Sequence, residues 1–266
     1  MPVVPGGYSN VSWAGRTAPE IRDTATTPGS VLVVPVGSVE QHGHHLPVAT
    51  DTLLADAVAT AAADQVADDA PVLVAPPVST GYSPHHLSFG GTITGEFDDR
   101  LTTLTSIADS ALENGFAALL FVNGHGGNRA LVDAAVSEVG KDHPDVEVLG
   151  LTYFDLAADE ADGIRKSETG GMAHAGEFEA SLLLHLAPDL VRDDRPATPF
   201  DEPYEWAGSD LLEGGPLFAY RDFEEYSESG AIGDTEVASA ETGEQLFAVV
   251  VDELAEVLRA IHARNA

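Results

Sequence analysis

The chain has 266 residues, of which 44% are hydrophobic, so it can bury a sizeable core and is not expected to be disordered. It contains no cysteine, which excludes disulfides and thiolate metal ligands. Its 44 acidic and 12 basic residues give a net charge of −32, and only two of the basic residues are lysine. Such a surface repels nucleic-acid phosphates and anionic membranes, so we expect neither as a partner.

The acidic residues are spread along the chain, a distribution typical of a halophilic protein from a salt-rich cytoplasm. No apolar run approaches the roughly 18–20 residues that a transmembrane helix needs. The first residues lack the basic region and apolar stretch of a secretory signal. We therefore expect a cytoplasmic protein.

Predicted strands and helices alternate along most of the chain. They are strand 30–37, helix 52–63, strand 71–75, helix 97–114, strand 117–122, helix 129–140, strand 146–152, helix 174–186 and helix 244–263. The strand segments are apolar at consecutive positions, so both faces of the sheet are expected to be covered. This predicts an α/β fold with a mostly parallel sheet and helices on both sides, in one domain over residues 1–266. Residues 193–235 are expected to form an excursion or an oligomer contact.

A cluster of histidines and acids follows the first predicted strand, at Glu40-Gln-His42-Gly-His-His45, and extends to Asp51. In an extended segment residues i and i+2 face the same way, so Glu40 and His42 can converge on one point. Imidazoles and carboxylates are suitable ligands for Zn²⁺, Mn²⁺ or Fe²⁺. The alternative is a polar loop whose histidines are simply exposed.

A glycine-rich turn, Asn123-Gly-His125-Gly-Gly-Asn128, follows the third predicted strand. In open α/β sheets ligands bind at the carboxyl ends of the strands, where this turn is expected. Such a turn can also bind a phosphate, but this one lacks the G-x-G-x-x-G spacing and the P-loop lysine. The central imidazole favours a metal.

A third candidate is His174-Ala-Gly-Glu177-Phe-Glu179, at the start of a predicted helix. Residues three apart share a helix face, so His174 and Glu177 could supply a metal ligand and a proton-transfer group together. The alternative is a first helical turn whose acids interact with the helix dipole. The segment Tyr82–His86 is a weaker candidate for a substrate-facing loop.

In this order, the motifs resemble those of the creatininase (creatinine amidohydrolase) family over residues 8–262. The similar segments are Val36-Gly-Ser-Val-Glu40-Gln-His42 through Asp51, Ser88-Phe-Gly-Gly-Thr92, Asn123–Asn128, His174-Ala-Gly-Glu177-Phe-Glu-Ala-Ser181 and Gly230-Ala-Ile-Gly-Asp234. The resemblance implies a three-layer α/β/α fold, usually a homohexamer, with two divalent metal ions that open C–N bonds of cyclic or linear amides.

The resemblance also assigns roles by position. Glu40 and His125 would bind one ion and His42 the other, with Asp51 bridging both. His174 would be the acid/base group beside them. The residues expected to face the substrate are His86, Gly126 and Asn128.

One departure bears on the second metal. Family members that hydrolyse creatinine carry a Glu two residues after the His of the Asn-Gly-His motif, where this chain has Gly127. We expect Glu177 to replace it, as a metal ligand and as a catalytic group. The aromatic residues that line the creatinine pocket are also missing, so creatinine is not the expected substrate.

The sequence therefore predicts a metal-dependent amidohydrolase that attacks a small cyclic or linear amide with a metal-bound hydroxide. One alternative is a formamide deformylase acting on a pyrimidine nucleotide in flavin or deazaflavin biosynthesis, and another is a small-peptide hydrolase. The scarcity of Lys and Arg opposes a phosphate-bearing substrate, although Arg129 follows the glycine-rich turn. Non-enzymatic alternatives are an inactive metal-binding protein and a nucleotide-binding regulator.

Overall fold

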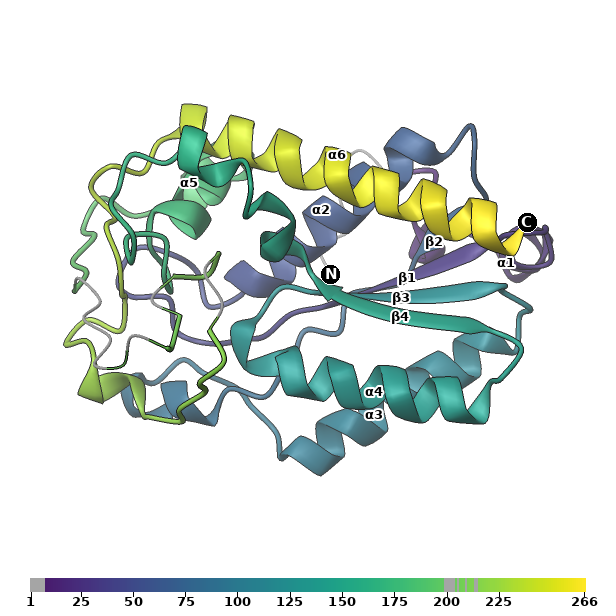
Figure 1. Cartoon of the computed structure of the whole chain (residues 1–266), viewed down its shortest axis with the longest axis horizontal. Coiled ribbons are helices and arrows are strands. Elements are labelled where there is room, and N and C mark those ends of the chain that lie inside the picture. The colour runs from purple at the N-terminus through teal and green to yellow at the C-terminus, as the bar shows by residue number, and fades with distance from the viewer. Residues whose placement is uncertain (1–7, 199–203, 205, 209, 213–214) are drawn as a thin grey trace.

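The computed structural model describes residues 8–198, 204, 206–208, 210–212 and 215–266. A parallel sheet lies at its centre, with strands in the order β2-β1-β3-β4 (Figure 1). The strands are β1 (Val31–Val36), β2 (Val72–Val74), β3 (Ala118–Asn123) and β4 (Glu147–Thr152). Every residue of β1 and β3 is buried, because both faces of these central strands are covered.

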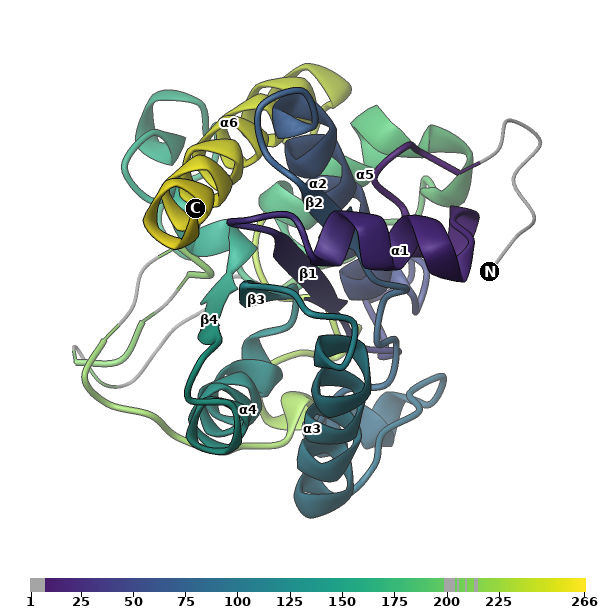
Figure 2. The same ribbon diagram turned by 90° about the vertical axis from the view of Figure 1, so that its right-hand side faces the viewer.

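Helices cover both faces of the sheet (Figures 1 and 2). One face carries α2 (Thr50–Val66), α5 (Glu177–Leu186) and α6 (Ala240–Asn265), and the other carries α3 (Phe97–Leu112) and α4 (Arg129–Asp142). The short helix α1 (Ala18–Ala25) packs near β2 at the edge of the sheet. The predicted α/β fold, with a mostly parallel sheet between helices, is confirmed.

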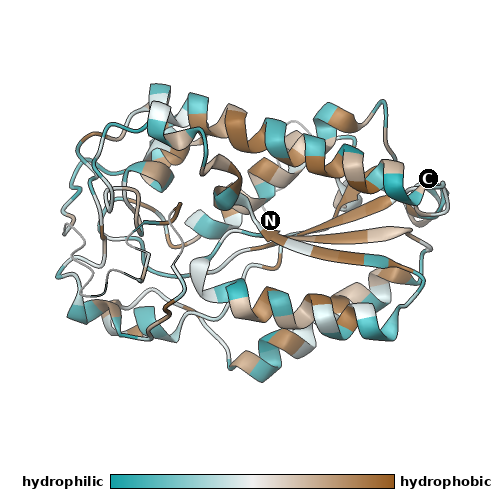
Figure 3. Cartoon of the chain, viewed as in Figure 1, coloured by the Kyte–Doolittle hydropathy of each residue, from teal (hydrophilic) through white to brown (hydrophobic). Residues whose placement is uncertain are grey.

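Successive side chains of β1 enter two separate apolar cores, because side chains alternate across a strand. Val31 and Val33 pack in the core beneath α2 and α6, whereas Leu32 and Val34 pack in the core formed with α3 and α4. The hydropathy colouring shows the apolar strands between amphipathic helices (Figure 3). Packing in the two cores holds the strands in place, and this sets where the loops at the carboxyl edge of the sheet begin.

The helix predicted at 174–186 was placed three residues too early. α5 begins at Glu177, and His174 lies in the preceding loop. Ala175 has a φ of 56°, which no right-handed helix accommodates. The expectation that His174 and Glu177 share one helical face is therefore wrong.

The segment 193–235 was predicted to be an excursion, and residues 199–203, 205, 209, 213 and 214 of it lie outside the described residues. Its described part contains no strand and one short 3₁₀ helix, Phe223–Glu225. This described part lies at the carboxyl end of the sheet, on the left of Figure 1. In the described part of the chain, no helix is both long and apolar enough to cross a membrane.

Candidate metal centre

Two neighbouring strands deliver the first candidate ligands to one place. β1 and β3 pair in parallel up to Val36 and Asn123, so the loops that follow them leave the sheet side by side. The first loop carries Glu40 and His42, and the second carries His125. At Gly124 a Cβ would lie 2.8 Å from the carbonyl oxygen of Asp51, so glycine allows this loop to approach the first turn of α2.

Glu40, Asp51 and His125 form one group of potential ligands, all of them buried. Nδ1 of His125 lies 3.1 Å from Oε2 of Glu40 and 3.4 Å from Oδ2 of Asp51. Its Nε2 lies on the other side of the ring, 3.0 Å from Oγ of Ser83 and 3.3 Å from the carbonyl oxygen of Tyr82. Because a carbonyl can only accept, Nε2 carries a proton, and Nδ1 is the nitrogen that faces the carboxylates and would bind a metal once its own proton is lost.

His42, Asp51 and Glu179 form a second buried group. Nε2 of His42 lies 3.0 Å from Oδ1 of Asp51 and 3.6 Å from Oε1 of Glu179. Its Nδ1 lies 3.1 Å from the carbonyl oxygen of Glu40, to which it donates. The charges of Asp51 and Glu179 raise the pKa of His42 despite its burial, so in the metal-free protein Nε2 donates a proton to Asp51, and a metal ion would take the place of that proton.

Asp51 belongs to both groups and contributes a different oxygen to each. Oδ2 of Asp51 and Oε1 of Glu40 are buried and make no hydrogen bond within the described chain. A buried carboxylate oxygen without a donor is unfavourable unless a cation neutralises it. The orphaned oxygens and the imidazole nitrogens that face the carboxylates fit divalent metal ions of the zinc, manganese or iron kind.

The charges of this cluster are strongly coupled. Burial and the nearby charge of Glu40 raise the pKa of Asp51 to about 7. Burial favours the neutral form of His125, but the charges of Glu40 and Asp51 more than offset it and raise its pKa to about 9. The neighbouring buried carboxylates of Glu40 and Asp51 thus attract positive charge. In the metal-free protein, bound protons supply that charge.

His174 lies beside the cluster rather than within a helix. Its Nδ1 is 3.8 Å from Oε1 of Glu40, and its Nε2 donates to the backbone carbonyl oxygen of Gln41 at 2.8 Å. Burial and the neighbouring rings of His42 and His86 hold the pKa of His174 well below its usual value. The ring is therefore neutral, with an unprotonated Nδ1 directed at the site.

Glu177 is the expected ligand that the structure does not bring to the cluster. Its carboxylate accepts hydrogen bonds from the backbone N–H groups of Lys166 and Ser167, at 2.8 and 2.9 Å, and from the hydroxyl of Ser167. Every hydrogen bond found for this buried carboxylate comes from Lys166 or Ser167. Glu179, two residues later in the same motif, occupies the position expected for Glu177.

The residues expected to face the substrate have different surroundings. Nδ1 of the buried His86 ring accepts from the amide of Gln41 at 2.8 Å, and its Nε2 lies 3.2 Å from Oε1 of Glu40 without a hydrogen bond to it. The buried amide of Asn128 accepts from the N–H of Tyr82 and donates to the carbonyl of Gly37. These two side chains support the loops of the site. Gly126 is exposed, and a Cβ there would meet nothing within 4 Å, so it borders open space.

Two further residues at the site were not anticipated from the sequence. The hydroxyl of Ser83 donates to Oε2 of Glu40 at 2.5 Å. The ring of Phe223 lies over the histidines, with its centroid 4.0 Å from that of His86 and 4.8 Å from that of His174. Ser83 lies in the segment 82–86, a weaker candidate for a substrate-facing loop in which the serine itself was not singled out. No local pattern identifies Phe223, because its loop is remote in sequence from the motifs.

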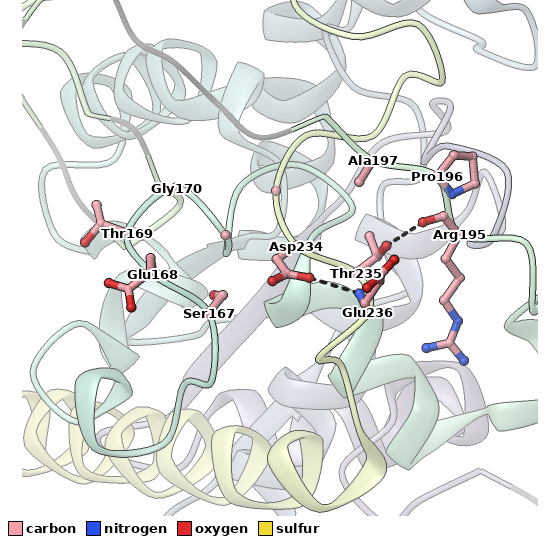
Figure 4. Close-up of a pocket in the computed structure, with 12 residues that line it drawn as sticks. Ser167, Glu168, Thr169, Gly170, Arg195, Pro196, Ala197, Asp234, Thr235 and Glu236 are labelled. Carbon is pink, nitrogen blue, oxygen red and sulfur yellow. Dashed lines mark hydrogen bonds between the residues drawn. The ribbon is translucent and has the colours of Figure 1, made fainter.

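A cavity of about 470 Å³ lies next to the loop that Glu177 holds (Figure 4). It is lined by residues 167–171, 195–197 and 233–236. None of the metal-cluster residues lines it, and the side chain of Asp234 there accepts from the backbone N–H of Glu236. The cavity is thus separate from the candidate metal centre.

Comparison with known proteins decides the family. The model of the family described as creatininase, creatinine amidohydrolase, matches residues 14–258. The chain belongs to the creatininase family. It is a hydrolase acting on C–N bonds, and the resemblance noted in its motifs is confirmed.

Individual relatives of this creatininase-family hydrolase differ in what they act on. It is 35% identical to a mycofactocin precursor peptide peptidase of Mycobacterium tuberculosis (strain CDC 1551 / Oshkosh), over 84% of this chain and 82% of the relative. It is 30% identical to the creatinine amidohydrolase of Pseudomonas putida, over 86% and 88%. A solved manganese creatininase aligns with a TM-score of 0.80 at 27% identity, covering 95% of this chain and 98% of that one. A creatininase mutant of the Zn-Zn type gives a TM-score of 0.79 at 27% identity, covering 95% and 98%.

Proposed function

We propose that this chain hydrolyses an amide bond of a short peptide or other small linear amide with the help of two divalent metal ions. Glu40, Asp51 and His125 would bind one ion, and His42, Asp51 and Glu179 the other. The observation that carries the proposal is the sharing of Asp51 by two buried ligand groups, with one oxygen in each. Relatives solved with zinc or manganese support the same class of ion.

When bound, the two ions would lower the pKa of water toward about 7 and polarise an amide carbonyl. The neutral His174 would take the proton of the attacking water on Nδ1 and return it to the departing nitrogen. The carbonyl of Gln41 fixes the tautomer that this step needs, because it holds the other proton of the ring on Nε2. Phe223 packs against the rings of His86 and His174 and would help to exclude bulk water from them.

Two observations favour a peptide or linear amide as the substrate. The relatives with 33–35% identity are named as precursor peptide peptidases. Gly126 and Gly127 also leave the turn after β3 without side chains, and Gly126 faces open space into which an extended substrate can continue. A cyclic amide remains a second candidate, supported by the creatinine amidohydrolase relative.

The nucleotide deformylase is less well supported. Arg129, the basic residue beside the glycine-rich turn, directs both terminal guanidinium nitrogens to the carboxylate of Asp155, at 2.6 Å each. Its guanidinium also lies 5.1 Å from the centroid of the Phe154 ring. A phosphate would have to break a bidentate ion pair to bind there.

Three broader expectations complete the proposal: a single domain over residues 1–266, a homohexamer and a halophilic source. The family match over residues 14–258 supports the first two. The net charge of −32 supports the third.

The proposal is tested on protein purified in high salt, stripped of metal and reloaded with Zn²⁺, Mn²⁺ or Fe²⁺. Metal per chain is measured by mass spectrometry, and new amines are measured after incubation with dipeptides, linear amides, creatinine and a formamidopyrimidine nucleotide. We expect about two ions per chain and metal-dependent cleavage of peptides or linear amides. Asp51→Asn should abolish both, and Asp68→Asn, at an exposed position of the loop after α2, should change neither. Full activity of the metal-free protein would refute the proposal.

A further inference from the structure

His45 is a buried histidine that belongs to neither ligand group. It follows the ligand His42 by three residues, and its side chain is 0% exposed. Nε2 lies 2.9 Å from the carbonyl oxygen of Ala175, and Nδ1 makes no hydrogen bond within the described residues. Burial also lowers the pKa of the ring, so His45 is neutral and its Nε2–H donates to Ala175.

Ala175, the acceptor, is held in an unusual conformation. It is the only non-glycine residue with a positive φ in the described parts of the chain, at 56°. This region is unfavourable for an L-residue and persists only where the surroundings impose it. Ala175 directly follows His174, so its conformation sets the direction in which the His174 imidazole leaves the backbone.

Both polar groups of Ala175 are tied to the metal centre. Its carbonyl accepts from His45, in the loop that carries His42. Its N–H donates to Oε2 of Glu179 at 2.5 Å, while Oε1 of Glu179 faces His42. Ala175 therefore connects the loop of His174 to the loop that carries His42 and to the carboxylate of Glu179.

We propose that His45 is a positioning residue for proton transfer: by holding the carbonyl of Ala175 it keeps Nδ1 of His174 directed at the metal centre. The inference rests on the proposed role of His174. His45 is in none of the candidate ligand groups, and it acts through the backbone of Ala175.

The kinetic test replaces His45 in the metal-loaded full-length enzyme. His45→Leu keeps the ring's approximate volume but removes the donor, and we expect kcat to fall by about 10- to 100-fold with two metals retained and KM little changed. His45→Gln, whose amide can donate from nearly the position of Nε2, should recover most of this loss. His44→Leu is the matched control, because His44 is exposed and lies next to Asp194.

A double-mutant cycle separates positioning from general damage. In a His174→Ala background, His45→Leu should change kcat by less than about twofold, because the group it positions is gone. Ala175→Gly combined with His45→Leu should recover activity, since glycine adopts a positive φ without strain. Equal effects of His45→Leu with and without His174, or loss of a metal ion in His45→Leu, would overturn the inference.

A crystal structure tests the positioning role of His45 without an activity measurement. In a crystal structure of zinc-loaded His45→Leu, Ala175 should leave the positive-φ region and Nδ1 of His174 should move away from Oε1 of Glu40. An unchanged Ala175 and His174 would refute the positioning role even if no amide is found to be hydrolysed. If His45→Leu does not fold, His45→Asn, whose amide is too short to reach the carbonyl, replaces it in all measurements.

Discussion

Glu177 and Glu179 lie two residues apart on the first turn of α5, yet their carboxylates serve different sites. Oε1 of Glu179 lies 3.6 Å from Nε2 of His42, in the second ligand group. The oxygens of Glu177 accept the N–H groups of Lys166 and Ser167. Residues two apart on a helix are separated by about 200°, so only one of them can face the metal centre.

Glu179→Gln should therefore lose one of the two metal ions. An amide is a weaker ligand than a carboxylate, and Glu179 is the third member of the second group. We expect metal content to fall toward one ion per chain, and kcat to fall by about 100-fold or more. Metal analysis by mass spectrometry checks this, and an unchanged stoichiometry of two would contradict it.

Glu177→Gln should keep both metal ions and lower stability instead. The amide NH₂ would face backbone N–H groups that now donate to a carboxylate, which leaves buried donors unpaired. The cost is about 1–3 kcal/mol in the free energy of unfolding. Denaturant unfolding of the metal-loaded variant measures it, with Glu168→Gln at an exposed position of the same loop as the control. Metal loss without destabilisation would reverse our assignment of the two glutamates.

His174→Ala should impair turnover and leave metal binding intact. Its Nδ1 is the unprotonated nitrogen directed at the site, so removing it removes the proton carrier. A decrease in kcat of about 10²- to 10⁴-fold is expected. His44→Ala, at an exposed histidine, is the control. Normal turnover of His174→Ala would exclude it from proton transfer.

Metal affinity should rise steeply with pH. In the metal-free protein Asp51 is protonated below about pH 7 and His125 below about pH 9, and a metal ion must displace both protons. Titration calorimetry in buffers of different ionisation enthalpy should show protons released on binding, and fewer of them as the pH rises. Affinity and proton release that do not change from about pH 6 to about pH 9 would contradict these pKa shifts.

The same shifts predict how the stability of the metal-free protein depends on pH. Both folded-state pKa values lie above the ordinary values of 3.8 for Asp51 and 6.5 for His125, so the fold favours the protonated forms. The stability that they contribute is lost as pH rises through about 7 and then about 9. Thermal unfolding of metal-free protein should show a falling midpoint over this range, and the metal-loaded protein should not.

Salt should stabilise the folded chain. A net charge of −32 repels itself, and raising the salt concentration from 0.1 to 1 M shortens the screening length from about 10 to about 3 Å. The unfolding midpoint should rise with KCl between these concentrations and should rise less with sucrose of matched osmolality. A midpoint independent of KCl would remove the support for a halophilic source.

The sequence by itself determined the class of fold and most of the candidate ligands of the proposed metal centre. Consecutive apolar positions in β1 and β3 required a sheet covered on both faces, and parallel pairing brings the carboxyl ends of adjacent strands together. The resemblance of the motifs to the creatininase family placed Glu40 and His125, far apart in the chain, on one metal ion, and the parallel pairing of β1 and β3 is what brings their loops together. Local chemistry was sufficient here because each motif directly follows the strand that positions it.

Only the tertiary structure decided which side chains of those motifs meet. Because Ala175 has a positive φ, α5 begins only at Glu177. On the helix that begins there, Glu179 rather than Glu177 faces His42. Likewise, His86 and Asn128 stand in suitable motifs, but contacts with distant loops engage their polar atoms. Spacing along the chain indicates which groups can lie near one another. The direction of each side chain depends on backbone angles and on contacts with distant segments, and these are set only in the folded chain.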